Sequence, residues 1–188
     1  MTENSSFGQS RSTTKECAFL AVFVAVVIAV QLALSFVPGV ELVTVLFVTY
    51  SFVMGVKRGM ISATAFALLR QIIFGFYPLV LILYLVYFNL LVFCFGMLGK
   101  KRKFTPKFLP LLVIVACVCT ACFTMLDNVL TPLWYGYGEK ATRLYFYGSL
   151  TFMIPQLICT AVTVFILFIP LFKTFAVMKN KITNSRLE

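Results

Sequence analysis

Six long apolar runs divide the sequence and constrain its fold more than any other feature. Each run is continuously apolar instead of alternating between apolar and polar residues. A helix needs about 20 apolar residues to cross a bilayer. Lipid accepts only a backbone whose N–H and C=O groups are bonded internally, so runs of this kind predict helices. The predicted spans cover about residues 17–37, 41–54, 60–76, 79–98, 108–130 and 148–172.

The composition supports a membrane setting. Of the 188 residues, 61% are hydrophobic and 12% are charged, whereas a soluble domain carries about 25% charged residues. We therefore predict an all-α integral membrane protein, a bundle of six transmembrane helices that forms a single domain over residues 16–178. Residues 1–15 are predicted to be a disordered cytoplasmic tail, and residues 179–188 a second cytoplasmic tail.

The basic residues predict the orientation of the bundle. Of the 16 Lys and Arg residues, 13 fall on the side that holds both chain ends, whereas Lys140 and Arg143 fall opposite and Arg70 lies within a span. Because Lys and Arg gather in cytoplasmic loops, both termini are predicted to be cytoplasmic. The same rule accounts for the net charge of +10, and we do not expect nucleic-acid binding.

Polar residues concentrate in the outer half of the predicted bundle. Arg70 and Gln71 lie in the third span, Tyr84 lies in the fourth, and Asp127 and Asn128 lie near the outer end of the fifth. A guanidinium in a bilayer is costly and usually faces a cavity or a partner. These residues therefore predict an outward-facing substrate site with aromatic walls.

Internal pairing is the alternative explanation for the same residues. Arg70 could form an ion pair with Asp127 or Glu41, or its side chain could extend to the outer lipid headgroups. Polar side chains in membrane helices also join neighbouring helices by hydrogen bonds, and this structural role is the one we predict for Asn89 and Gln156.

Residues 131–147 are rich in aromatic side chains and are predicted to form the one long external loop. Trp134, Tyr135 and Tyr137 are added from this loop to the candidate substrate-binding residues. Trp and Tyr favour the headgroup region, so the loop is either an interfacial belt or a lid over the cavity. The sequence favours neither interpretation.

Alanines recur every four residues along one face of the first span, at Ala21, Ala25, Ala29 and Ala33. Small residues at this spacing let another helix approach closely in lipid. The partner is either another helix of this chain or a different membrane subunit.

The sequence gives no support to an enzyme. It contains no His and therefore no Ser-His-Asp or Cys-His arrangement. It also lacks paired carboxylates suited to hydrolysis and glycine-rich nucleotide-binding motifs. Its six cysteines lie in apolar runs and are predicted to be small buried hydrophobes. We expect no catalysis, no metal and no cofactor.

Several features together resemble the S components of energy-coupling factor (ECF) transporters. They are the six predicted spans, the alanine ladder over residues 21–29, the motif Pro-x-x-Glu at residues 38–41, and the glycine-flanked turn over residues 55–59. The resemblance covers about residues 15–178. It implies a non-catalytic subunit of the prokaryotic plasma membrane that captures a vitamin outside and docks on a transmembrane coupling protein bearing two ATPases. Ala21, Ala25 and Ala29 would then be the docking residues.

The resemblance of the first three helices is to the cobalamin-type S component, so cobalamin is the expected vitamin. Another vitamin such as pantothenate is the alternative, because Arg70 could bind its carboxylate. A structural or chaperone-like membrane protein without any small ligand is the alternative outside transport.

Overall fold

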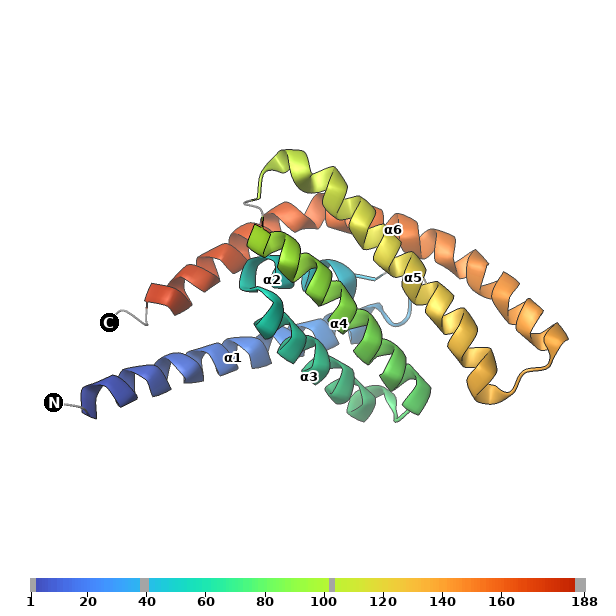
Figure 1. Ribbon diagram of the computed structural model, residues 1–188, viewed down its shortest axis with the longest axis horizontal. Coiled ribbons are helices and arrows are strands. Elements are labelled where there is room, and N and C mark those ends of the chain that lie inside the picture. Colours follow the sequence, from blue (N-terminus) through green and yellow to red (C-terminus); the bar gives the residue numbers. More distant parts are fainter. Residues whose placement is uncertain (1–2, 38–40, 102–103, 185–188) are drawn as a thin grey trace.

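A computed structural model describes residues 3–37, 41–101 and 104–184 of the chain, with side chains from residue 14 to residue 182 within those ranges. All regular structure in these ranges is helical (Figure 1). The elements are α1 (Glu3–Leu34), α2 (Val43–Met54), α3 (Val56–Phe74), α4 (Pro78–Lys101), the short 3-10 helix η1 (Pro106–Phe108), α5 (Leu109–Tyr135) and α6 (Glu139–Asn184).

Four segments are long and apolar enough to cross a membrane, namely Thr14–Leu34, Pro78–Lys101, Pro106–Tyr135 and Glu139–Ile182. They bear out the prediction of a helical protein suited to a membrane. The remaining two predicted spans correspond to α2 and α3. Helix α2 is a shorter apolar helix, and α3 carries Lys57 and Arg58 in its first turn.

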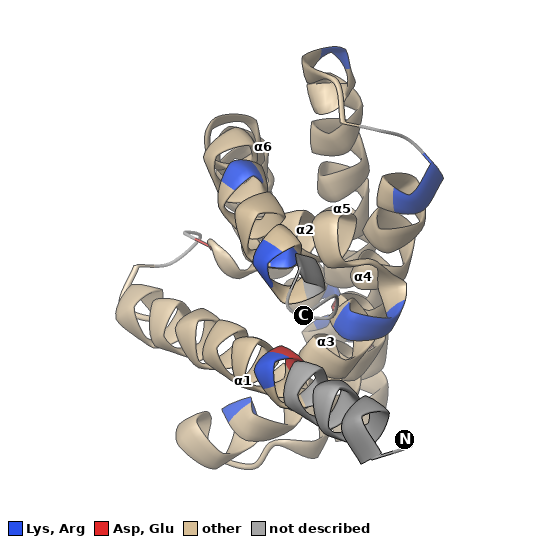
Figure 2. Cartoon of the chain, turned by 90° about the vertical axis from the view of Figure 1, so that its left-hand side faces the viewer, with Lys and Arg blue, Asp and Glu red and all other residues tan. Residues whose placement is uncertain are grey.

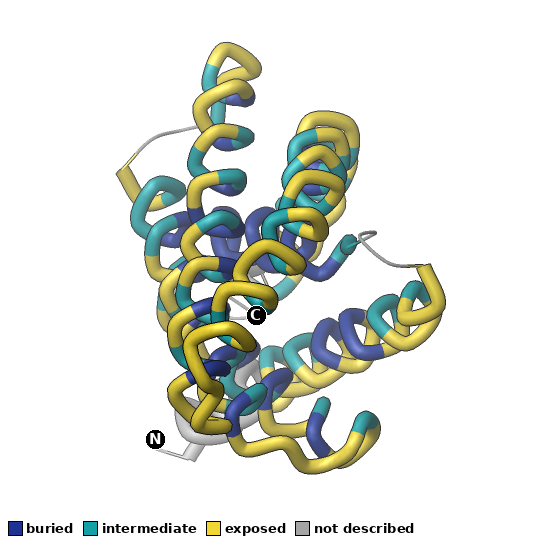
Figure 3. Tube along the Cα trace, turned by 90° about the vertical axis from the view of Figure 1, so that its right-hand side faces the viewer, coloured by how far each residue is buried: buried dark blue, intermediate teal, exposed yellow. Residues whose placement is uncertain are grey.

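Helix α2 lies at the centre of the bundle, which explains why so short a helix can be so apolar. All 12 of its residues are buried, and it contacts α1, α3, α4 and α6. The Phe23 ring stacks on Tyr50 at a centroid distance of 3.9 Å, and Phe47 lies against Phe88 at 4.9 Å. Buried residues gather toward the middle of the bundle and exposed residues lie on the outer helices (Figure 3). Many of the exposed side chains are large and apolar, of the kind that lipid would cover.

Glycines allow the helices to approach closely at one end of α2. Gly55 has a φ of +87° and turns the chain from α2 into α3, a conformation that favours glycine. A Cβ added to Gly99 on α4 would collide with the backbone carbonyl of Phe52, and one added to Gly96 would collide with the backbone of Val56. The α4 glycines therefore bring α4 against the α2–α3 turn.

The predicted ends of the first and last helices differ from the observed ones. Helix α1 begins at Glu3, so most of the segment predicted as a disordered tail is helical. Helix α6 extends to Asn184 instead of ending near residue 172, and it includes Pro155 and Pro170. Residues 38–40, which hold part of the Pro-x-x-Glu motif, lie outside the described residues.

The prediction of a long external loop over residues 131–147 is wrong. Helix α5 continues to Tyr135 and α6 begins at Glu139, so the connection is residues 136–138. Gly136 adopts the left-handed conformation, with a φ of +64°, and ends α5. Pro132 lies one turn before this end without breaking the helix. The aromatic residues thus belong to the tip of a helical hairpin.

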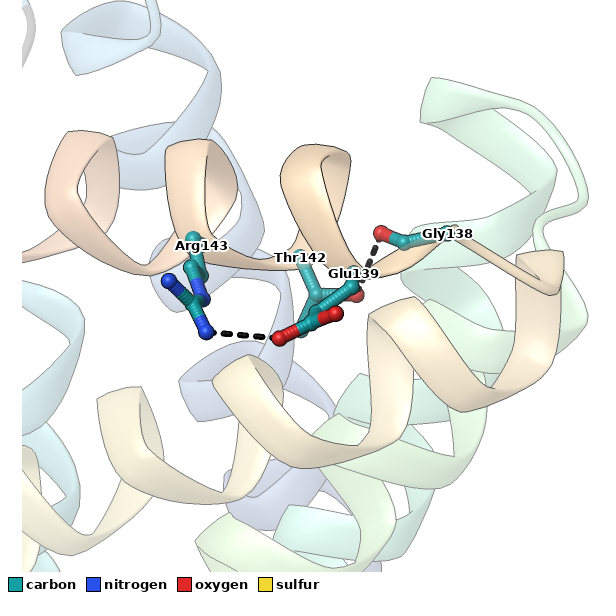
Figure 4. A network of polar contacts seen from close by, with 4 residues as sticks. All are labelled: Gly138, Glu139, Thr142 and Arg143. Carbon is teal, nitrogen blue, oxygen red and sulfur yellow. Dashed lines mark hydrogen bonds and ion pairs between the residues drawn. The ribbon is translucent and has the colours of Figure 1, made fainter.

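Both the beginning of α1 and the end of α6 lie at the same end of the bundle (Figure 1). A view onto this end shows Lys and Arg near the ends of α4 and α6 (Figure 2). The tip of the α5–α6 hairpin lies at the opposite end, where Arg143 pairs with Glu139 and Thr142 donates to the Gly138 carbonyl (Figure 4).

Candidate functional site

A cavity of about 430 Å³ is lined by residues from all six α-helices and from the segment between α1 and α2. Its polar lining comes from α1, α3, α4, α6 and that segment, and its aromatic lining comes from α3, α4, α5 and α6. The polar residues are Gln31, Ser35, Glu41, Arg70, Tyr84, Tyr87 and Gln156, and the rings besides the tyrosines are Phe74, Phe88, Phe123 and Phe152. The cavity thus combines aromatic walls with a few charged and amide groups.

Arg70 is the cation of this cavity, and its guanidinium lies between two rings. Its Cζ is 4.9 Å from the centroid of Phe74 and 4.3 Å from the centroid of Tyr84. The Nε atom is buried and has no hydrogen-bond partner. No carboxylate among the described residues forms an ion pair with Arg70, so the rings hold its orientation while its charge remains unneutralised.

Glu41 is the carboxylate of the same cavity, and it is held by α6 instead of by Arg70. Gln156 Nε2 donates a hydrogen bond to Glu41 Oε2 at 3.0 Å. The backbone N–H of Glu41 donates to Cys159 Sγ at 3.3 Å. These two contacts fix the start of α2 against α6 and hold the Glu41 side chain on the cavity lining.

Hydrogen bonds among amide and hydroxyl groups connect the helices around the cavity. Gln31 Nε2 donates to the Tyr84 hydroxyl at 3.2 Å, whereas Gln31 Oε1 is buried without a partner. On the other side, the Tyr87 hydroxyl lies 3.3 Å from the hydroxyl oxygens of both Thr44 and Thr120. The cavity therefore offers the unpaired donor of Arg70 and the unpaired acceptor of Gln31 in one compartment.

A second cavity of about 350 Å³ lies between α5 and α6. It shares Phe123, Phe152 and Gln156 with the first cavity. Its carboxylate, Asp127, accepts hydrogen bonds from Thr131 and Tyr145, both at 2.7 Å. Both carboxylate oxygens of Asp127 accept hydrogen bonds within the protein, whereas Arg70 Nε has no hydrogen-bond partner. Asp127 is therefore less available to a ligand than Arg70.

The structure separates the residues predicted to bind substrate into four places. Arg70 and Tyr84 line the first cavity and Asp127 lines the second. Gln71 and Asn128 are buried and line neither; Gln71 Oε1 accepts from the Tyr77 N–H, and Asn128 Oδ1 accepts from Ser149. The aromatic candidates of the hairpin tip are exposed and line neither cavity: Trp134, Tyr135 and Tyr137.

Five polar residues of the first cavity are not among the predicted substrate-binding residues, and three of them, Gln31, Glu41 and Gln156, carry amide or carboxylate groups. Glu41 is predicted as an ion-pair partner of Arg70 and as the acid of the Pro-x-x-Glu motif, Gln156 is predicted as a structural residue, and Gln31 is not singled out. Each of these three residues lies within an apolar stretch or at its start. A polar residue at such a position is the sequence signal that could have identified it as part of a site. Gln156 does brace the bundle, through Glu41, and it also borders both cavities.

The alanine ladder lies on the outside of the bundle. Ala21, Ala25 and Ala29 are exposed, whereas Val24 and Val27 on the other side of α1 are buried. The alternative that this ladder packs against helices of the same chain therefore does not hold for the described residues. An apolar surface with small side chains remains available to lipid or to a partner helix.

Comparisons with protein-family models, with characterised proteins and with solved structures find no match to this chain.

Proposed function

We propose that this chain is the substrate-binding S component of an ECF-type importer, which captures a small vitamin and delivers it inward with an ATP-driven coupling module. In this proposal six helices span the plasma membrane and both termini are cytoplasmic. The observation that carries the proposal is the unpaired Arg70 in an aromatic cavity of about 430 Å³.

A guanidinium without an internal carboxylate partner favours an external anion in a protein surrounded by lipid. Burying an Arg inside a membrane is unfavourable unless it pairs or reaches water. Arg70 has no ion-pair partner among the described residues. The planar guanidinium matches a carboxylate, which it can bind through two parallel hydrogen bonds. A substrate that carries a carboxylate would therefore complete the site.

The size of the cavity favours a small vitamin over a corrinoid. A volume of about 430 Å³ lies in the lower part of the range for pockets that bind drug-sized ligands, about 300–1,000 Å³. Cobalamin is much larger than a drug-sized ligand and would require the two cavities to join by movement of Phe123 and Phe152. We therefore place a carboxylate vitamin such as pantothenate ahead of cobalamin.

The exposed alanine ladder supports the proposed docking of this chain on a coupling module. Ala21, Ala25 and Ala29 leave a shallow apolar strip on α1, and close helix approach in lipid uses such strips. In an ECF-type complex this strip would contact the transmembrane coupling protein, which carries the two ATPases. The chain itself would then perform no catalysis.

Ligand-dependent thermal stabilisation of the purified full chain tests the capture function. Each compound of a vitamin panel that includes pantothenate and cobalamin is added in excess, and the melting temperature is recorded. A ligand at 100 times its Kd stabilises the folded state by about 2.7 kcal/mol. We expect one carboxylate compound to raise the melting temperature of the wild type and of Arg143→Gln, but not of Arg70→Gln.

Arg143 serves as the control because it is an exposed arginine at the hairpin tip that lines neither cavity. Stabilisation of Arg70→Gln to the same extent as the wild type would contradict the assigned role of Arg70. Absence of stabilisation by any compound would instead favour the structural or chaperone-like alternative.

A further inference from the structure

We infer that a basic cavity at the end of the bundle that carries both termini binds a phosphate group, of the kind carried by an anionic phospholipid. This cavity has a volume of about 620 Å³ and is separate from the two cavities described above. It lies between the α2–α3 turn, the last turns of α4 and the last part of α6. The inference is independent of the vitamin site, with which it shares no residue.

All charged side chains that line this cavity are positive. Four cationic side chains contribute to it from three different helices, and no carboxylate does. They are Lys57, Arg58, Lys100 and Lys179. Cations gathered around a concave site with apolar walls focus a positive potential on it, so an anion is the complementary ligand.

Two of the four cations, Lys57 and Lys100, have no carboxylate partner among the described residues. Arg58 forms an ion pair with Glu16 of α1 at 3.0 Å. Lys179 donates a hydrogen bond to the Val53 carbonyl at 2.7 Å, which places its ammonium group beside the α2–α3 turn.

The start of α3 adds hydrogen-bond donors to the cavity, whereas the carbonyls at the end of α2 lie at the same turn, where that of Val53 accepts from Lys179. Helix α3 begins at Val56 after Gly55, and both residues line the cavity. The first N–H groups of a helix lack intrahelical acceptors, and the helix dipole places partial positive charge there. A phosphate group fits such an arrangement, because helix N-termini and Lys side chains both donate to its oxygens.

Apolar side chains also line the cavity, which favours a phosphate group that is attached to an apolar chain. Met54, Val56 and Phe52 provide apolar walls next to the cations. Basic pockets between helices at a membrane surface bind the headgroups of anionic lipids, whose acyl chains follow the apolar helix faces. Because a soluble phosphate offers the same oxygens without the chains, the two sources can be distinguished by experiment.

The test measures the melting temperature of the detergent-purified full chain with three probes. These are phosphatidylglycerol, zwitterionic phosphatidylcholine and inorganic phosphate. The variant Lys57→Gln/Lys100→Gln removes two lining cations, both of which are exposed and outside the buried core. The matched control Lys107→Gln/Lys173→Gln removes two exposed cations that do not line the cavity.

We expect phosphatidylglycerol to stabilise the wild type and the control more than phosphatidylcholine does. Each basic residue near a membrane surface contributes about 1 kcal/mol toward anionic lipid, so the Lys57→Gln/Lys100→Gln variant should bind phosphatidylglycerol roughly 30-fold more weakly. Native mass spectrometry should show the same loss as fewer retained lipid molecules. Equal stabilisation by inorganic phosphate, lost in the same variant, would support the site with a soluble ligand.

Two results would overturn the inference. One is equal stabilisation of the wild type, the lining variant and the control by phosphatidylglycerol, which would indicate a general effect of net charge. The other is absence of any effect of phosphatidylglycerol and of phosphate on the wild type. Should the double variant fail to fold, the single variant Lys100→Gln and the charge-preserving Lys57→Arg/Lys100→Arg replace it; the first should weaken binding and the second should retain it.

Discussion

Gln156 and Glu41 lie 115 residues apart in the sequence and are joined by a hydrogen bond of 3.0 Å from Gln156 Nε2 to Glu41 Oε2. The bond connects the segment before α2 to the middle of α6, and both side chains line the cavity that contains Arg70. The carboxylate that could have neutralised Arg70 is thus held by an amide instead. The free energy of folding and the charge balance of the cavity both depend on this contact.

Substitution Gln156→Leu should destabilise the protein by about 1–3 kcal/mol, because it leaves a part-buried carboxylate oxygen without its donor. The double substitution Glu41→Gln/Gln156→Leu should recover part of this loss, since a neutral amide is less costly to leave without that donor. Thermal unfolding in detergent measures both. A Gln156→Leu protein as stable as the wild type would show that the bond contributes little.

Substitution Arg70→Lys should weaken binding of a carboxylate ligand even though the positive charge is kept. Lys lacks the flat guanidinium that lies between Phe74 and Tyr84 and that can make two parallel hydrogen bonds. A loss of one charge-assisted hydrogen bond corresponds to about 1.5–3 kcal/mol, or roughly 10- to 150-fold in Kd. Isothermal titration with the ligand from the stabilisation panel measures it. If the Arg70→Lys protein bound the ligand with wild-type affinity, the flat guanidinium would not be required to recognise the carboxylate.

Substitution Gly99→Ala should destabilise the bundle by about 1–3 kcal/mol, because the new Cβ would collide with the Phe52 carbonyl and force α4 away from α2. Gly148→Ala is the matched control, since that glycine is also helical and has nothing within 4 Å of an added Cβ. The control should be unchanged or slightly more stable, as alanine favours helices. Equal effects of both substitutions would contradict the close contact.

A double-mutant cycle on Glu16 and Arg58 should give a coupling free energy of about 0.5–1 kcal/mol that falls as salt is added. Their side chains are 21% and 29% exposed, and the pair ties α1 to the start of α3. The same cycle on Glu139 and Arg143, which are 80% and 72% exposed, should give a smaller value. A larger coupling at the exposed pair would reverse the ranking expected from solvent screening.

Substitution Ala25→Trp should prevent assembly with the proposed coupling protein while leaving vitamin binding intact, because Ala25 is exposed on α1 and distant from the cavity lining. Ile158→Trp on α6 is the control, since Ile158 is 60% exposed but outside the alanine ladder. Co-purification measures assembly, and the melting shift with ligand measures binding. Normal assembly of Ala25→Trp would remove the ladder from the docking surface.

Local chemistry in the sequence determined the helical class and the positions of most helices. Continuous apolar runs leave the backbone no solvent to bond with, so helices follow from them, and the structure has α2 to α5 within a few residues of the predicted runs. The same argument identified Arg70, because a cation in an apolar run is costly wherever the helix lies.

Only the tertiary structure decided which polar groups meet. Arg70, Glu41 and Gln31 come from three separate segments, and no spacing along the chain places them in one cavity. The sequence predicts a loop at Trp134 and Tyr135, because the fifth apolar run ends near residue 130, whereas α5 continues through Pro132 to Tyr135. Burial of all of α2 also depends on its neighbours, because periodicity along one apolar helix cannot distinguish lipid from protein as its surroundings.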